Sequence, residues 1–128
     1  LPEILKQRRE QSEYYTEAFS EMEQLELPYV PEYTEHAFSS YMLRIKKGIK
    51  ITSTDIINKM SEKNISCRFG IQPLHKEPYF ADRGFSDKDF PVSCDVAERS
   101  FFIPIFPGLM KKDIDYIISN IKEILSKI

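Results

Sequence analysis

The last eighteen residues of the chain, KKDIDYIISNIKEILSKI (residues 111–128), carry the clearest structural pattern in the sequence. Apolar residues recur there at the i, i+3, i+4 and i+7 spacing that places them on one face of an α-helix. Two aspartates, Asp113 and Asp115, fall in the first turn, where the helix dipole favours acidic side chains. The stretch therefore predicts an amphipathic closing helix whose apolar face is Ile114, Ile117, Ile118, Ile121, Ile124, Leu125 and Ile128.

Three segments upstream of this helix are expected to form strands. Residues 37–46 alternate apolar with more polar side chains, the period-two pattern of a strand with one buried face. Residues 65–71 alternate in the same way up to Pro73 and present Arg68 on the polar face, whereas residues 101–105 are apolar throughout. The expected buried residues of the first two strands are Tyr41, Leu43 and Ile45, and Ile65, Cys67, Phe69 and Ile71.

Three further helices are expected. Apolar residues on one side of a helical wheel predict a long opening helix: Leu1, Ile4, Leu5, Tyr15, Ala18, Phe19, Met22 and Leu25. Its middle, residues 6–13, is entirely polar, which suggests a helix that bridges two bodies. The oxygen-rich cluster 52–55 can cap a second helix, and Asn64 can end it in a left-handed conformation. A charged loop at 81–89 precedes a short helix over 92–97.

The alternating order of helices and strands predicts the α+β class. We expect a small two-layer domain of about three strands covered by helices, with a long N-terminal bridging helix. At 128 residues and 15.1 kDa, the chain is expected to form a single domain over residues 1–128. Its 41% hydrophobic residues supply enough apolar surface for a core.

Composition also narrows the classes of partner. A net charge of -2 and a pI near 5.8 argue against a nucleic-acid groove, which needs clustered basic residues. No apolar run approaches the ~20 residues of a membrane span, so a soluble, cytoplasmic protein with no membrane partner is expected. The two cysteines, Cys67 and Cys94, and the two histidines, His36 and His75, lack the spacing of a zinc site. No metal is therefore expected, both thiols are expected to be reduced, and Cys67 is interpreted as a small core residue.

The densest group of candidate functional residues is RFGIQPLH (residues 68–75), which runs from a strand end into a loop that reaches Tyr79. Side chains at the end of a strand are held in a fixed orientation by the rigid strand, and binding residues often lie at such positions. The guanidinium of Arg68 offers a planar fork for phosphate or carboxylate, and the imidazole of His75 can donate, accept or shuttle a proton. The simpler interpretation is an exposed arginine and a loop histidine bonded to backbone. No glycine-rich phosphate loop or nucleophile motif accompanies them.

Other polar residues have structural interpretations. Arg99, in the Ala-Glu-Arg run 97–99, is expected in an ion pair at a helix end. The basic residues Lys6, Arg8 and Arg9 favour a solvated helix face, or an interface if the helix lies between two bodies. His36, beside a strand start, is expected to be a hydrogen-bonded structural histidine.

The order of these motifs resembles that of the small C-terminal domain of DegT/StrS-type sugar aminotransferases, which are pyridoxal-phosphate enzymes of the aspartate aminotransferase fold (fold type I). The matching segments are Arg8-Arg9 leading to Tyr15, the strand from His36 to Ile45, Arg68 followed by Pro73-Leu74-His75 and Pro78-Tyr79, Phe90-Pro91, Ala97-Glu98-Arg99, Ile103-Pro104 and Asp113-Ile114-Asp115-Tyr116. The segment 68–75 is most similar to the perosamine-synthase branch. It departs from the family at Gly70-Ile71, where aromatic or His-Tyr residues are usual, and Met110 stands where Ser or Thr is common.

The resemblance implies an enzyme that transfers an amino group from glutamate to the keto group of a nucleotide-linked sugar, in polysaccharide or secondary-metabolite biosynthesis. It places the Schiff-base lysine and most pyridoxal 5'-phosphate contacts in a large domain upstream of Leu1, so the chain alone is expected to be inactive. It implies a homodimer for the full-length enzyme. Within this chain it points to substrate contacts by Arg68 with an anionic group, by His75 with the sugar, and by Tyr79.

Two alternatives remain open at this point. One is a sugar dehydratase that uses the same cofactor, in which the lysine is replaced. The other belongs to a different class: a non-catalytic binding or assembly domain that has kept the fold and uses the helix face of residues 6–13 for a partner.

Overall fold

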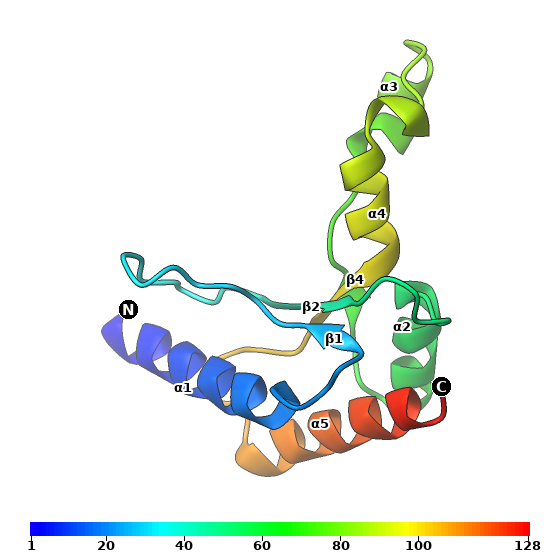
Figure 1. The fold of residues 1–128 in the computed structure, drawn as a ribbon. Coiled ribbons are helices and arrows are strands. Elements are labelled where there is room, and N and C mark those ends of the chain that lie inside the picture. The colour runs from blue at the N-terminus through cyan, green and yellow to red at the C-terminus, as the bar shows by residue number, and fades with distance from the viewer.

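The computed structural model describes all 128 residues and shows a small antiparallel sheet packed against helices (Figure 1). The helices are α1 (Pro2–Phe19), α2 (Ser53–Glu62), α3 (Pro78–Ala81), α4 (Pro91–Arg99) and α5 (Lys111–Ser126), with 3-10 turns η1 (Leu74–Lys76) and η2 (Asp87–Asp89). The strands are β1 (Leu25–Glu26), β2 (Tyr41–Ile45), β3 (Arg68–Phe69) and β4 (Ser100–Ile103). The predicted α+β class and two layers are confirmed. No helix combines the length and the hydropathy needed to span a bilayer.

The sheet has the order β1-β2-β4-β3, with every neighbouring pair antiparallel. Its centre is the β2–β4 pair, in which Tyr41 lies opposite Ile103 and Leu43 opposite Phe101. The predicted alternation is confirmed for residues 41–45, because Tyr41, Leu43 and Ile45 are all fully buried, but the strand begins four residues later than predicted: Phe38, with a φ of 43°, is not extended. These two strands therefore provide the surface on which the helical layer packs.

Helices α1 and α5 run along the sheet, and α2 stands at its end against α5 (Figure 1). The predicted apolar face of α5 is confirmed, except that Ile128 lies beyond the helix and is exposed. Thr52 and Asp55 form the capping box of α2, and Asn64 has a φ of 59° just after it, as expected. Ile65 then donates from its backbone N–H to the carbonyl of Met60 and becomes part of the core.

The opening helix ends earlier than its apolar pattern predicts. Helix α1 stops at Phe19, and the chain turns so that Leu25 pairs with Ile45 as the short edge strand β1. Leu25 is buried, as its apolar character requires, but in the sheet layer rather than on the helix. The sheet consequently has four strands where about three were expected.

The polar middle of α1 makes contacts inside this domain. Arg8 donates to the carbonyls of Phe38 and Ser39, both at 2.8 Å, and Gln11 donates to the carbonyl of Phe106 at 3.0 Å. These side chains therefore tie two irregular segments to the helix, because backbone carbonyls without a strand partner need donors. The bridging of a second body by α1 stays a prediction.

The second predicted strand is much shorter than its alternation suggests. Only Arg68 and Phe69 pair with β4, and Phe69 is 56% exposed although it was expected on a buried face. The physical reason is that β3 lies at the edge of the sheet and has a single partner. After Gly70 donates to the carbonyl of Ser100, the chain leaves the sheet. The predicted burial of Ile71 is also only partial.

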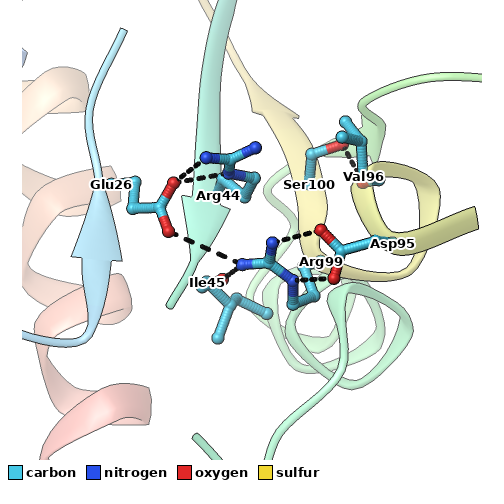
Figure 2. A network of polar contacts seen from close by, with 7 residues as sticks. All are labelled: Glu26, Arg44, Ile45, Asp95, Val96, Arg99 and Ser100. Carbon is cyan, nitrogen blue, oxygen red and sulfur yellow. Dashed lines mark hydrogen bonds and ion pairs between the residues drawn. The ribbon is translucent and has the colours of Figure 1, made fainter. Parts of the chain in front are cut away.

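A cluster of charges fastens α4 to the sheet (Figure 2). Arg99 binds the carboxylate of Asp95 through two nitrogens, donates to the carbonyl of Ile45, and lies 3.7 Å from a carboxylate oxygen of Glu26, which also pairs with Arg44. The Arg99 side chain is only 13% exposed. Its hydrogen bonds hold the pKa of the Asp95 carboxyl below the usual value. The predicted ion pair at the end of this helix is confirmed.

We expect Arg99→Met to lower the free energy of unfolding by about 2–3 kcal/mol, because it leaves the Asp95 carboxylate and the Ile45 carbonyl without their donor and leaves Glu26 with Arg44 alone. Urea denaturation followed by circular dichroism measures the change. As a control, Lys127→Ala removes an exposed pair with Glu123 and should alter stability by less than about 1 kcal/mol. Equal midpoints for the two variants would contradict this account.

Candidate functional site

The residues between β3 and β4, 70–99, form an arm that rises away from the sheet (Figure 1). It contains η1, α3 and η2 and returns through α4. Prolines begin both of its α-helices, Pro78 in α3 and Pro91 in α4, where the missing N–H costs nothing. The segment predicted as a charged loop, 81–89, is largely irregular but includes η2.

Arg68 lies on β3 at the foot of the arm, with its side chain exposed. Its guanidinium makes no hydrogen bond or ion pair within the chain, so its donors are available to a ligand. Together with Ser39, Ser40 and Tyr116 it lines an open hollow of about 840 Å³ beside the sheet. Of the predicted site residues, Arg68 is the one whose charge is free to bind an anion.

His75 lies inside the arm and is only 6% exposed. Its Nε2 is 2.8 Å from Oδ1 of Asp87 and 3.4 Å from Sγ of Cys94, and its ring stacks on Phe90 with centroids 5.0 Å apart. Hydrogen bonds from His75 and then from Lys76 hold the pKa of the Asp87 carboxyl below its usual value. The simpler interpretation expected a hydrogen bond from this histidine to the backbone. The structure shows instead that its partners are side chains.

Tyr79 lies on α3 and is 62% exposed. The guanidinium of Arg83 lies 3.6 Å from the centroid of its ring, a cation–π contact, and also donates to the Tyr79 carbonyl at 2.6 Å. The phenol is left to the solvent. The ring is thus held from one side while its polar end remains available.

The three predicted site residues do not share one hollow of this chain. Arg68 lines the one beside the sheet, whereas His75 lines a separate hollow of about 370 Å³ within the arm, walled by Phe80, Phe85 and Phe90. Tyr79 lines neither of them. Their joint action on a substrate stays a prediction.

Sequence reasoning missed the neighbourhood of Cys94. This residue was treated only as a reduced thiol, yet its Sγ lies beside His75 and Asp87. Partial burial and the contact with Asp87 raise the pKa of the Cys94 thiol. The sequence could have indicated this contact only through the metal-binding and acid–base side chains of the three residues, because they are 7 to 19 positions apart and follow no regular spacing. By contrast, Cys67 packs against the core as predicted, and burial raises its pKa to about 11.

His36 is structural, as expected, since its Nδ1 accepts a hydrogen bond from the backbone N–H of Phe38 at 2.9 Å. The lysines do not form a cofactor pocket: every one of them is exposed. A lysine that forms a Schiff base needs a shielded site that lowers its pKa. The residues of this chain therefore do not fit a pyridoxal phosphate site on their own.

Comparison with known proteins identifies the family. The model of the DegT/DnrJ/EryC1/StrS aminotransferase family matches residues 1–122, and the chain belongs to this family. It is 31% identical over 128 residues to MJ1066 of Methanocaldococcus jannaschii and 27% identical to the spore coat polysaccharide biosynthesis protein SpsC of Bacillus subtilis. GDP-perosamine synthase of Caulobacter vibrioides is 26% identical over 98 residues, which are 77% of this chain and 26% of that enzyme.

Solved structures show the same fold. The aminotransferase TlmJ from Streptoalloteichus hindustanus superposes with a TM-score of 0.85 over 99% of this chain at 20% identity. The Spr1654 protein of Streptococcus pneumoniae, solved in PLP and PMP forms, gives TM-scores of 0.88 and 0.89 over 98% of the chain, also at 20% identity. This chain covers only 32–33% of those chains and 33% of MJ1066 and SpsC. It thus spans about one third of the proteins that it matches.

The departure from the family pattern at Gly70 has a local physical reason. A β-carbon at Gly70 would lie 2.0 Å from Oγ and 2.9 Å from the backbone carbonyl carbon of Ser100. The Ser100 hydroxyl itself is fixed, because it donates to the carbonyl of Val96 at 2.6 Å. The chain therefore enters the arm by a close approach of the Gly70 backbone to Ser100, mainly to its side chain, that leaves no room for a β-carbon.

We expect Gly70→Ala to destabilise the fold by about 1–3 kcal/mol, the usual cost of overpacking a filled site. Adding Ser100→Gly removes the nearest atoms and should recover part of the loss. The neighbouring exposed change Ser66→Ala is the control and should alter the urea midpoint little. A Gly70→Ala variant as stable as Ser66→Ala would overturn the explanation.

Proposed function

We propose that this chain is the C-terminal small domain of a pyridoxal-phosphate-dependent aminotransferase that moves an amino group from glutamate to the keto group of a nucleotide-linked sugar. The observation that carries the proposal is the family match over residues 1–122, which is nearly the whole chain. The coverage of about one third supports a further, larger domain. Relatives named for polysaccharide biosynthesis and perosamine synthesis support a sugar substrate.

In this proposal the large domain precedes Leu1 and supplies the Schiff-base lysine and most of the cofactor contacts. Pyridoxal phosphate acts as the electron sink when bound. The intact enzyme is a cytoplasmic homodimer, and the 128-residue chain alone is inactive. Every lysine of this chain is exposed, which agrees with a Schiff-base lysine supplied by the large domain.

The role of this domain is to bind and orient the sugar nucleotide. Arg68 binds an anionic group, because its guanidinium is exposed and free of internal partners. Tyr79 offers its phenol from the arm. His75 acts as a positioning residue: its Nε2 already faces Asp87 and Cys94, so it holds the shape of the arm on which Tyr79 is carried.

A dehydratase is the second candidate. The chain is 25% identical over 114 residues to dTDP-4-dehydro-2,6-dideoxy-D-glucose 3-dehydratase of Saccharopolyspora spinosa, which supports a sugar dehydratase of the same fold. The residue at the Schiff-base position of the large domain discriminates the two. A lysine there favours transamination, and its replacement favours dehydration.

The first expected outcome concerns the size of the native product. Because the chain spans about one third of its relatives, the product in its source cell should be about three times heavier than 15.1 kDa. Intact-protein mass spectrometry, after capture with an antibody to this domain, measures it. A product of the mass of the domain alone would overturn the aminotransferase proposal and favour a stand-alone binding module.

The second expected outcome concerns Arg68. In the intact enzyme, Arg68→Ala should raise KM for the sugar nucleotide about tenfold or more, since a hydrogen bond to a charged group contributes about 1.5–3 kcal/mol. The change should leave KM for glutamate and the thermal midpoint nearly unaltered. The control Lys122→Ala removes an exposed cation on α5 and should alter neither KM. An unchanged KM for the sugar in Arg68→Ala would remove Arg68 from the substrate site.

A further inference from the structure

Three side chains of metal-ligating type meet inside the arm, and they come from three separate elements. His75 lies on η1, Asp87 begins η2, and Cys94 lies in the first turns of α4. Their nearest ligating atoms, Nε2, a carboxylate oxygen and Sγ, all lie within 4.8 Å of one another. An imidazole, a carboxylate and a thiol that converge on one point form a donor set for a divalent ion.

The geometry does not support a nucleophilic triad. In such a triad the acid binds one imidazole nitrogen and the nucleophile binds the other, so that the ring relays a proton. Here Asp87 and Cys94 both face Nε2 of His75, at 2.8 Å and 3.4 Å. A single ring nitrogen cannot serve both partners in a relay, whereas three donors that face each other suit a common ion.

We propose that His75, Asp87 and Cys94 bind one divalent ion of the zinc class and that the ion joins the three segments of the arm. Zinc bonds of about 2.0–2.3 Å in tetrahedral geometry place neighbouring ligand atoms about 3.3–3.7 Å apart. The His75–Cys94 pair, at 3.4 Å, lies in that range, the His75–Asp87 pair, at 2.8 Å, is shorter, and all three atoms lie within 4.8 Å of one another, so small side-chain shifts would bring them to the distances of a zinc site. Three protein ligands leave the fourth position to water.

The surroundings of the three ligands are already ordered. The ring of Phe90 stacks on His75 and fixes the imidazole plane. Lys76 holds the other carboxylate oxygen of Asp87 at 3.1 Å, which leaves Oδ1 turned toward His75. Ser86 and Asp89 form a capping box that fixes η2. Contacts of this kind, made to the ligand residues and not to the ion, orient the ligands and strengthen metal binding.

Access from solvent also suits a cation. Asp87 and Cys94 line an open hollow of about 960 Å³ between the arm and α2, which gives an ion a path from solvent. Metal binding by these three residues does not require the proposed transferase function, although the same His75 would also hold the arm that carries Tyr79.

Cobalt(II) titration of the metal-free 128-residue chain under reducing conditions tests the site. A thiolate–cobalt charge-transfer band should appear in the near ultraviolet, together with visible bands of tetrahedral cobalt, and saturate at one ion per chain. The chain provides a matched control, because it has two cysteines. Cys94→Ala should abolish the charge-transfer band, and Cys67→Ala should leave it unchanged.

Zinc should displace the cobalt and raise the thermal midpoint of the parent chain and of Cys67→Ala, but not that of Cys94→Ala. Binding should tighten as the pH rises from about 6 to about 8, because the ion displaces the thiol proton and competes with protonation of the imidazole. Asp87→Asn, which keeps the side-chain volume, should weaken cobalt binding at least tenfold. Absence of the charge-transfer band in the parent chain, or its persistence in Cys94→Ala, would overturn the proposal.

Discussion

The contacts of one guanidinium hold the two parts of this domain together. The arm is joined to the sheet covalently at only two points, where the chain leaves after Gly70 and returns at Ser100. Arg99, next to the return point, binds Asp95 on α4, the Ile45 carbonyl at the end of β2 and Glu26 on β1 (Figure 2). The interaction thus spans three elements and anchors the end of α4 to the sheet, together with Ser53 on α2, whose hydroxyl donates to the Glu98 carbonyl at 2.7 Å. A charge this buried is tolerable only because its hydrogen bonds are nearly all satisfied.

This attachment explains how the domain can position groups that lie far from its core. The apolar core lies between the sheet and helices α1, α2 and α5, whereas the arm has no fully buried large apolar side chain. Its order comes from polar and aromatic contacts instead: the Asp87–His75–Cys94 group, the His75–Phe90 stack and the Arg83–Tyr79 contact. A segment ordered in this way gains more from an additional ligand, or from a bound ion, than a segment already fixed by a core.

The proposed division of roles agrees with the side chains that this structure exposes. Nothing in these residues shields a lysine or activates a nucleophile, while Arg68 and Tyr79 offer donors toward solvent. In the proposed enzyme, such donors would orient the substrate. That arrangement agrees with a family in which this chain corresponds to about one third of the protein.

Periodicity determined most of the fold, because it reports which face of an element meets the core. The face of α5, the alternation of β2 and the caps of α2 follow directly from residue spacing, and so does the α+β class. Predictions from periodicity were wrong where hydrogen bonding to a neighbouring strand, and not burial, sets the bounds of an element. Leu25 continues the apolar side of α1 yet lies in a strand, and the alternation of 65–71 gives only two paired residues because the edge has one neighbour.

The sequence by itself also identified the residue types of the candidate site and the family to which the chain belongs. The tertiary structure alone decided which of those residues are free and which are engaged: Arg68 is without a partner, and His75 is turned toward Asp87 and Cys94. The reason is that η1, η2 and α4 approach each other only after the arm closes back onto β4. Residues that lie 7 to 19 positions apart in the sequence and meet only in the folded arm produce no periodic pattern that could have predicted their contact.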